Sequence, residues 1–136
     1  MNTSTNGDTV KSGSTEIRWN PVSRVAFVRY SAGASLGRVD GPFLVDALTG
    51  WIGSKGEPFS VLADGAGLRG TDAEYRAHVS RFFRRHRHTA CIALINLGPV
   101  IRVVVEMFGI GTGIPLKTFA DEEAARSWLR AQGIAA

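Results

Sequence analysis

The stretch FSVLADGAGLRGTDAE, residues 59–74, decides the fold, because it passes from an apolar run through a glycine-rich loop to a helix start. Residues 59–64 are mainly apolar and are bounded by proline and glycine, which is typical of a buried strand. Residues 65–70 form the loop. Thr71 and Glu74 then have the spacing of a capping box, in which the two side chains satisfy reciprocal backbone donors. The stretch therefore predicts strand, loop and helix in succession, the repeating unit of an α/β protein.

The flanking sequence continues this alternation. Runs rich in β-formers predict strands at 16–19, 25–30, 89–95 and 114–119, and apolar residues at helical spacing predict helices at 40–53, 100–108 and 121–129. Glycine-containing segments at 31–37 and 109–113 are interpreted as loops. The order β-β-α-β-α-β-α-β-α predicts an α/β domain with a single mixed, mainly parallel sheet and an antiparallel N-terminal hairpin strand.

The chain is long enough for one domain and too short for two, with 136 residues of which 44% are apolar. Residues 1–14 are polar without an apolar pattern, so we expect a disordered arm before a single domain over 15–136. The single cysteine, Cys91, excludes an intramolecular disulfide. The sequence has no signal segment and no apolar run of membrane-spanning length. We therefore expect a cytoplasmic protein without an integral membrane segment.

Two strings carry a resemblance to a known fold. They are residues 59–64 and TFADEEAARSWL at 118–129, the second containing the pattern F-x-x-x-x-x-A-x-x-W-L. Together with the element order, residues 16–132 resemble the STAS (SpoIIAA-like) fold, and most closely the bacterial stand-alone STAS/CRAL-TRIO-like domain group. The resemblance implies a non-enzymatic regulatory module that interacts with proteins. Its lipid-transfer members imply the alternative, a carrier of a small apolar or lipid-like ligand in a cavity between sheet and helices.

The loop after the third strand is the docking region that the resemblance implies. Anti-sigma-factor antagonists of this fold carry a phosphorylated serine there, but residues 64–71 contain no serine, so we do not transfer the phosphorylation switch. Ligands of α/β sheets gather at the carboxyl ends of strands. The candidate binding residues are therefore Asp64, Gly65, Gly67 and Thr71. The simpler interpretation is an Asp-Gly turn followed by a capping threonine.

Residues 100–108 have an unusually apolar sequence for a surface helix. As a helix, this segment is apolar on nearly every side except at Arg102 and Glu106, whereas a surface helix normally has a wider polar face. A buried strand or core helix is the simpler interpretation. The functional interpretation is a dimer face, a docking face or a lid over an apolar ligand, with Val100, Val104 and Phe108 as candidate contacts.

The basic residues are unevenly distributed. The net charge is +4, and residues 81–88 alone hold four arginines and no acid. Arg84 and Arg85, with the neighbouring arginines at 81 and 87, are candidates for steering an acidic protein partner. The simpler interpretation is a solvated helix end, where cations suit the helix dipole. Four clustered arginines are a weak signal for nucleic acid, so a protein partner or a homodimer is the expectation.

No motif in the sequence indicates catalysis, a metal or a cofactor. Cys91 lies between apolar residues and is interpreted as a core thiol. His86 and His88 are two residues apart, which is not the spacing of a helical metal pair, and no acid or cysteine lies beside them. The glycines of residues 109–113 resemble a phosphate loop in letters only, because they precede a strand. We therefore expect neither an enzyme nor a cofactor-binding protein.

Overall fold

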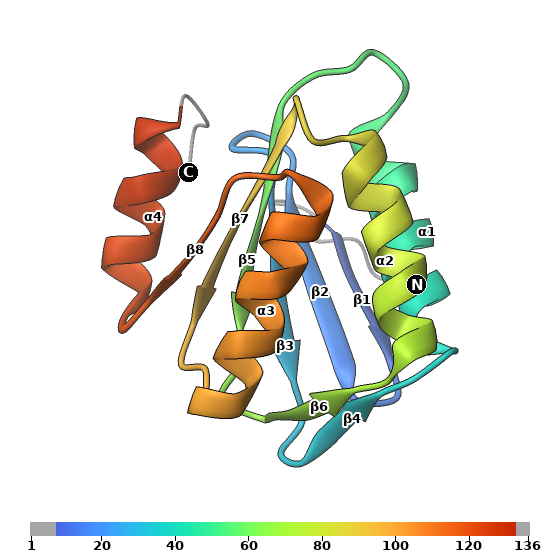
Figure 1. Ribbon diagram of the computed structural model, residues 1–136. Helices are drawn as coiled ribbons and strands as arrows, with labels where there is room; N and C mark the ends of the chain where they lie inside the picture. The colour runs from blue at the N-terminus through green and yellow to red at the C-terminus, as the bar shows by residue number, and fades with distance from the viewer. Residues whose placement is uncertain (1–7, 133–136) are drawn as a thin grey trace.

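The computed structural model describes residues 8–132 and shows a mixed sheet between two layers of helices (Figure 1). The six strands of the main sheet are β1 (Asp8–Ser12), β2 (Thr15–Asn20), β3 (Val25–Tyr30), β5 (Phe59–Asp64), β7 (Ala90–Ile95) and β8 (Leu116–Phe119). Two further strands, β4 (Ala34–Leu36) and β6 (Leu68–Thr71), pair with each other. The helices are α1 (Asp40–Ile52), α2 (Ala73–Arg85), α3 (Pro99–Thr112) and α4 (Glu122–Ala131).

The main sheet has the order β1-β2-β3-β5-β7-β8. β1, β2 and β3 pair antiparallel, and β3, β5, β7 and β8 pair parallel. Helices α1, α2 and α3 cover one face, whereas α4 lies alone on the other (Figure 1). The predicted mainly parallel sheet with an antiparallel N-terminal hairpin is thus confirmed.

Alternating side chains of the central strands build two cores. Val61 of β5 and Ile92 of β7 point to the larger core under α1, α2 and α3. Leu62 of β5 and Ala93 of β7 point to the opposite face, where they meet Leu129 of α4. Because both faces of these strands are covered, β7 is continuously apolar and β5 is apolar except at Ser60 and Asp64, as expected for buried parallel strands.

The prediction of a disordered arm over residues 1–14 is wrong for residues 8–12, which form β1. Val10 pairs with Ile17 in an antiparallel register, and the Trp51 Nε1–H donates to the Asp8 carboxylate at 3.2 Å. The polar sequence of β1 does not show the pattern of a strand, because this edge strand is held mainly by backbone pairing with β2. Residues 1–7 lie outside the described part of the chain.

The segments predicted as loops at 31–37 and 65–70 contain β4 and most of β6. The Ala34 N–H donates to the Gly67 carbonyl at 2.9 Å, and the Asp72 N–H donates to the Leu36 carbonyl at 2.9 Å. Each segment thus satisfies backbone hydrogen-bonding groups of the other. Strands of only three and four residues are too short to show a recognisable sequence pattern. This small sheet lies across one end of the main sheet, below α2 and α3 in Figure 1.

The predicted helix at 100–108 is confirmed, but the predicted loop at 109–113 is wrong. α3 continues to Thr112 and ends at Gly113, whose φ of 75° is the left-handed conformation that favours glycine. A β-carbon at Gly109 would lie 3.1 Å from the β-carbon of Leu116. Glycine inside the helix therefore lets α3 approach β8 closely, and it is not a loop signal here.

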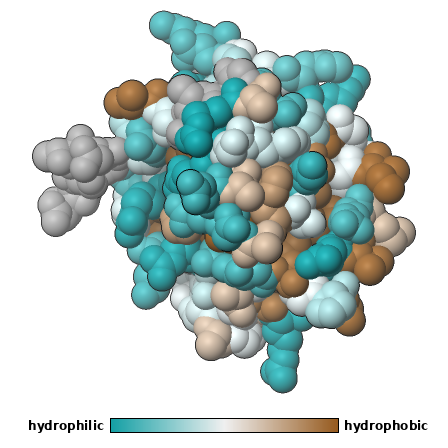
Figure 2. All heavy atoms as spheres, turned by 90° about the vertical axis from the view of Figure 1, so that its left-hand side faces the viewer, coloured by the Kyte–Doolittle hydropathy of each residue, from teal (hydrophilic) through white to brown (hydrophobic). Residues whose placement is uncertain are grey.

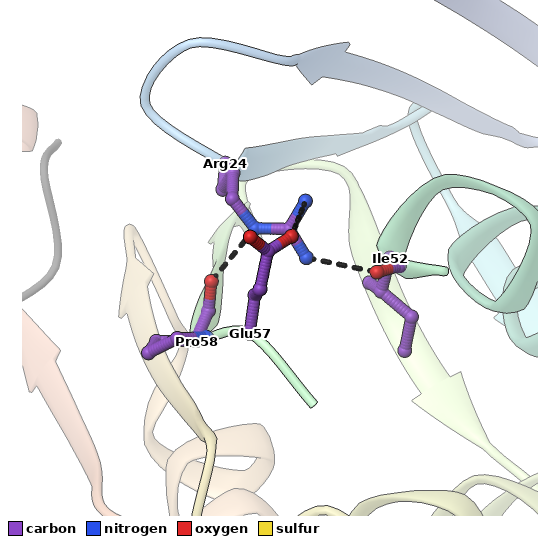
Figure 3. Close-up of polar contacts among 4 residues, drawn as sticks. All are labelled: Arg24, Ile52, Glu57 and Pro58. Atoms are coloured by element: carbon purple, nitrogen blue, oxygen red, sulfur yellow. Dashed lines mark hydrogen bonds and ion pairs between the residues drawn. The ribbon is translucent and has the colours of Figure 1, made fainter. Parts of the chain in front are cut away.

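One arginine joins three parts of the fold at the other end of the sheet (Figure 3). Arg24 lies in the turn between β2 and β3, and its guanidinium donates to the carbonyls of Pro58 at 2.9 Å and Ile52 at 3.0 Å. Glu57 lies 3.7 Å away, and the guanidinium also stacks over the Trp19 ring at 5.4 Å. Arg24 thereby fixes the end of α1 against the start of β5.

Candidate functional site

A small apolar cavity of about 100 Å³ lies between α2, α3 and the main sheet. Its walls include Val61 and Leu94 from the sheet, Val79 and Phe83 from α2, and Phe108 from α3. A space of this kind can hold an apolar group but offers water few partners.

Four polar side chains also line this cavity. They are Tyr30 at the end of β3, Thr71 at the end of β6, and Tyr75 and Arg76 in the first turns of α2. The side chains of the two tyrosines hydrogen-bond to each other, and burial raises the pKa of Tyr30 to about 12. Burial also raises the pKa of Tyr75, reinforced by the neighbouring Tyr30. Both phenols therefore stay neutral across the physiological range, and the Tyr30 hydroxyl, which accepts from Tyr75, still has its own proton to donate.

Arg76 has spare hydrogen-bonding capacity beside the cavity. Its Nη1 donates to the Thr71 carbonyl at 2.5 Å and to the Thr71 hydroxyl at 3.0 Å. Within residues 8–132, no acidic side chain forms an ion pair with Arg76, and its Nε and Nη2 donate to no other group. The cavity lining therefore includes a cation that forms no ion pair with a described carboxylate.

A second feature lies on the outside of α3. Four apolar side chains form an exposed stripe, the α3 stripe: Val100 (76% exposed), Val103 (56%), Met107 (67%) and Ile110 (83%). Their spacing of three, four and three residues places them along one side of the helix. In Figure 2, hydrophobic side chains gather along the right-hand edge, the side on which α3 lies in that view. Of the six exposed large hydrophobic side chains among the described residues, these four lie on α3.

The predicted residues of α3 separate between these two features. Val104 and Phe108 point inward and line the cavity, whereas Val100 belongs to the exposed stripe. Ile101 faces inward and is buried, and Arg102 is exposed on the outer side. The segment is therefore both a wall of the cavity and an uncovered surface, which combines two of the interpretations left open by the sequence.

The arginine cluster (Arg81, Arg84, Arg85 and Arg87) is exposed at the C-terminal end of α2. The Arg87 guanidinium donates to the Arg84 carbonyl at 3.1 Å, which satisfies one carbonyl at the helix end. The Arg87 side chain also lies beside Gly113, where α3 ends. Arg84 and Arg85 do not line the cavity, but the cluster lies near the Ile110 end of the α3 stripe.

Asp64 and the loop glycines have structural roles in this fold. The Asp64 carboxylate accepts the Ala66 N–H at 3.0 Å and the Asn96 side-chain amide at 3.1 Å, so it shapes the turn. A β-carbon at Gly67 would lie 2.5 Å from the carbonyl oxygen of Tyr30, and one at Gly65 would collide with the Leu97 side chain. None of these three predicted residues lines the cavity.

Thr71 does line the cavity, but the capping box predicted at this position is wrong. The residue before α2 is Asp72, whose carboxylate accepts the Tyr75 N–H at 2.8 Å. The β4–β6 pairing extends the strand through Thr71 and shifts the helix start by one residue. The Thr71 hydroxyl is therefore available to Arg76 instead of the helix backbone. Sequence reasoning missed Arg76, Tyr30 and Tyr75, because no local motif connects a strand end to the first turn of a distant helix.

Cys91 and His86, which the sequence analysis considered for catalysis or metal binding, both pack among apolar side chains. Burial raises the pKa of the Cys91 thiol to about 11. Burial, followed by the charge of Arg85, lowers the pKa of His86, whose ring packs against Phe82 at 4.6 Å. Among residues 8–132, no three side chains of the metal-binding types come together. Within the same range, no helix has both the length and the apolar character needed to cross a bilayer.

Comparison with known proteins shows the fold and nothing closer. No protein-family model matches the sequence, and no curated protein matches it. Among solved structures, the murine anion transporter Solute Carrier 26 family member A9, in its inward-facing state, superposes with a TM-score of 0.57 and 16% identity. The match covers 95% of this chain and 23% of the transporter, so this chain spans about a quarter of that protein.

A smaller protein matches over nearly its whole length. It is an uncharacterized protein of the DUF3478 family with a SpoIIAA-like fold, from Shewanella loihica PV-4, with a TM-score of 0.56 and 18% identity. The match covers 95% of this chain and 98% of that protein. These likenesses show that the chain has the STAS, or SpoIIAA-like, fold that the sequence resemblance implied.

Proposed function

We propose that this SpoIIAA-like domain is a non-catalytic regulatory module that docks a partner protein on the α3 stripe. The observation that carries the proposal is the exposure of four large apolar side chains in one row on a single helix. Exposed apolar rows of this kind mark interaction surfaces, because leaving them in water is unfavourable. Spacing of three and four residues also suits an apolar helix laid alongside α3.

The charges beside the stripe indicate the chemistry of the partner. The arginine cluster is exposed, and within the described residues none of its members forms an ion pair with an acid. We therefore propose a partner helix that has one apolar face and acidic side chains at the end that meets the arginine cluster. Such complementary charges raise the association rate and fix the orientation of the partner.

The test is a matched pair of charge insertions. Immobilised wild-type protein, Met107→Glu and Val22→Glu are compared for retention of the partner from the cells that express the protein. Val22 is 89% exposed in the turn between β2 and β3 and does not belong to α3, so it controls for an apolar-to-acid change outside the stripe. We expect Met107→Glu to weaken binding at least about tenfold, as truncation of a central interface residue does.

Two further results are expected from the same material. Raising the salt concentration releases the bound protein, and Arg84→Glu with Arg85→Glu slows association at low salt. Sedimentation velocity separates a hetero-partner from a second copy, because a homodimer on the stripe would dissociate in Met107→Glu. Equal retention by Met107→Glu and wild type would show that the stripe is not the docking surface.

The cavity favours a second candidate function, the binding of a small, mainly apolar ligand. The observation behind it is a space of about 100 Å³ whose lining is mostly apolar and which reaches the polar group of Tyr30, Tyr75, Thr71 and Arg76. Native mass spectrometry of the purified protein, compared with the denatured mass, tests this candidate. We expect an additional non-covalent mass in the native spectrum, and the bare sequence mass in both spectra would count against a retained ligand.

A further inference from the structure

Arg76 is the only charged side chain among the described residues that line the cavity. The other lining residues are apolar, apart from Thr71 and the two tyrosines. A charge beside apolar walls is unfavourable unless a counter-charge or several hydrogen bonds compensate it. Thr71 supplies two neutral acceptors to Nη1 and leaves the rest of the guanidinium without a partner among residues 8–132. Arg76 is half-buried, so solvent reaches part of the guanidinium, and an anion in the cavity would find donors there that no described protein group occupies.

The unused donors of Arg76 fit a planar anion. Nε and Nη2 can each donate a hydrogen bond, and two parallel donors of a guanidinium match the two oxygens of a carboxylate. Tyr30 and Tyr75 line the same cavity, and because the Tyr75 hydroxyl donates to Tyr30, the Tyr30 hydroxyl is the one that can donate to such a group. The nearby Asp40, whose charge raises the tyrosine pKa values, already accepts the Gly37 N–H at 2.8 Å.

The volume limits the apolar part of the ligand. A dry cavity of about 150 Å³ holds the six carbons of benzene, so about 100 Å³ holds roughly four carbons. The walls around this space are branched and aromatic side chains, including Val104, Phe108 and Val79, which suit a compact branched tail. A long acyl chain would need a much larger space than the cavity provides.

We infer that the cavity binds a short-chain carboxylic acid, with the carboxylate on Arg76 and a tail of about four carbons between α2 and α3. This inference rests on the ligand-binding function proposed above and names its ligand class. Thr71 holds the guanidinium in place, and the apolar walls exclude water from the tail. Discrimination comes from the single charge at Arg76, because the walls bind acids and their neutral analogues equally well.

The experiment uses 3-methylbutanoate and its neutral analogue 3-methylbutanamide, titrated separately into the full chain by NMR. The methyl resonances of Val79, Val104 and Leu94 report occupancy of the cavity. We expect the acid to bind about tenfold more tightly than the amide, the difference that a charge-assisted pair of hydrogen bonds provides. In Arg76→Met the acid should lose this advantage, whereas the affinity for the amide should stay the same.

Two variants keep the test independent of folding. Arg102→Met removes an exposed arginine of α3 that does not line the cavity, and it should leave both affinities unchanged. Arg76→Lys keeps the charge and should retain part of the preference for the acid, which shows that Arg76→Met acts through its charge. Circular dichroism and the unfolding midpoint verify that each variant is folded.

The outcomes separate the two proposals. If the amide binds as tightly as the acid, or if Arg76→Met retains the preference, the carboxylate inference is overturned and ligand binding in the cavity stands. If neither the acid nor the amide shifts the cavity methyl resonances, the ligand-binding function itself is overturned. Shifts that spread over surface residues instead of the cavity methyls would equally contradict both proposals.

Discussion

The Arg76 guanidinium donates to both oxygen atoms that Thr71 offers, the backbone carbonyl at 2.5 Å and the hydroxyl at 3.0 Å. This pairing joins the last residue of β6 to the first turn of α2 and positions the guanidinium at the cavity. It is possible because Asp72, and not Thr71, caps the helix. Thr71 therefore accepts hydrogen bonds from Arg76 at the cavity instead of capping the N-terminus of α2.

The first prediction follows from this division of roles. Asp72→Ala removes the side-chain acceptor of the Tyr75 N–H and should lower the free energy of unfolding by about 1 kcal/mol, as loss of an N-cap does. Thr71→Val keeps the shape and the backbone carbonyl, so it should cost less than Asp72→Ala. Urea unfolding of both variants checks the order. A larger loss for Thr71→Val would restore the capping box that the sequence predicts.

Arg24 gives the second prediction. Arg24→Ala leaves the Ile52 and Pro58 carbonyls without their donor and removes the packing on Trp19, so it should cost about 2 kcal/mol. Glu57→Gln is the matched control, since that carboxylate is 57% exposed and 3.7 Å from the guanidinium. It should cost at most about 0.5 kcal/mol. Comparable losses in the two variants would mean that the ion pair, rather than the carbonyl contacts, carries the effect.

The third prediction concerns the glycines that the sequence analysis placed in a binding loop. A β-carbon at Gly67 would lie 2.5 Å from the carbonyl oxygens of Tyr30 and Ser31, which are backbone atoms that cannot rotate away. Gly67→Ala should therefore destabilise the fold by about 3 kcal/mol. Gly70→Ala is the control, because nothing lies within 4 Å of its β-carbon position. Thermal unfolding of both variants distinguishes a packing role at Gly67 from a purely functional one.

The fourth prediction is a pH dependence at His86. Burial, and secondarily Arg85, lower its pKa in the folded state below the ordinary 6.5, so the unfolded state binds the proton more tightly. The resulting stability is present above about pH 6.5 and is lost as the pH falls through the lower folded-state pKa. His86→Phe keeps a ring against Phe59 and Phe82 but cannot titrate. Between about pH 7.5 and about pH 5, the wild type should lose more of its unfolding free energy than the variant.

The strands and helices with long periodic patterns could be predicted from sequence. β5 and β7 are mainly apolar because α4 and the other three helices cover both faces, and α3 has apolar residues at helical spacing. β1, β4 and β6 could not be predicted, since they are short or polar and are held by pairing with distant segments. The glycines of α3 were wrongly interpreted as a loop for a related reason. Gly109 is needed where α3 packs closely against Leu116 of β8, and the local sequence does not reveal that contact.

The candidate site was predictable only in part. Thr71, Val104 and Phe108 are candidate binding residues from the sequence, and all three line the cavity. Local sequence was enough to select them, because Thr71 follows a strand and loop, and the other two lie on an unusually apolar helix. Arg76 could not be found this way, since its importance depends on which charges are absent around it in three dimensions. The same holds for the contact between Tyr30 and Tyr75, which are far apart in the sequence.

The central claim, docking on the α3 stripe, is tested most directly by site-specific photocrosslinking in the cells that express the protein. A photoreactive residue is placed at position 107 in the stripe and, as control, at the exposed position 22 in the turn between β2 and β3. We expect one defined crosslinked species from position 107, weakened by Arg84→Glu with Arg85→Glu, and none from position 22. No crosslink at position 107, or the same species from both positions, would contradict docking on α3.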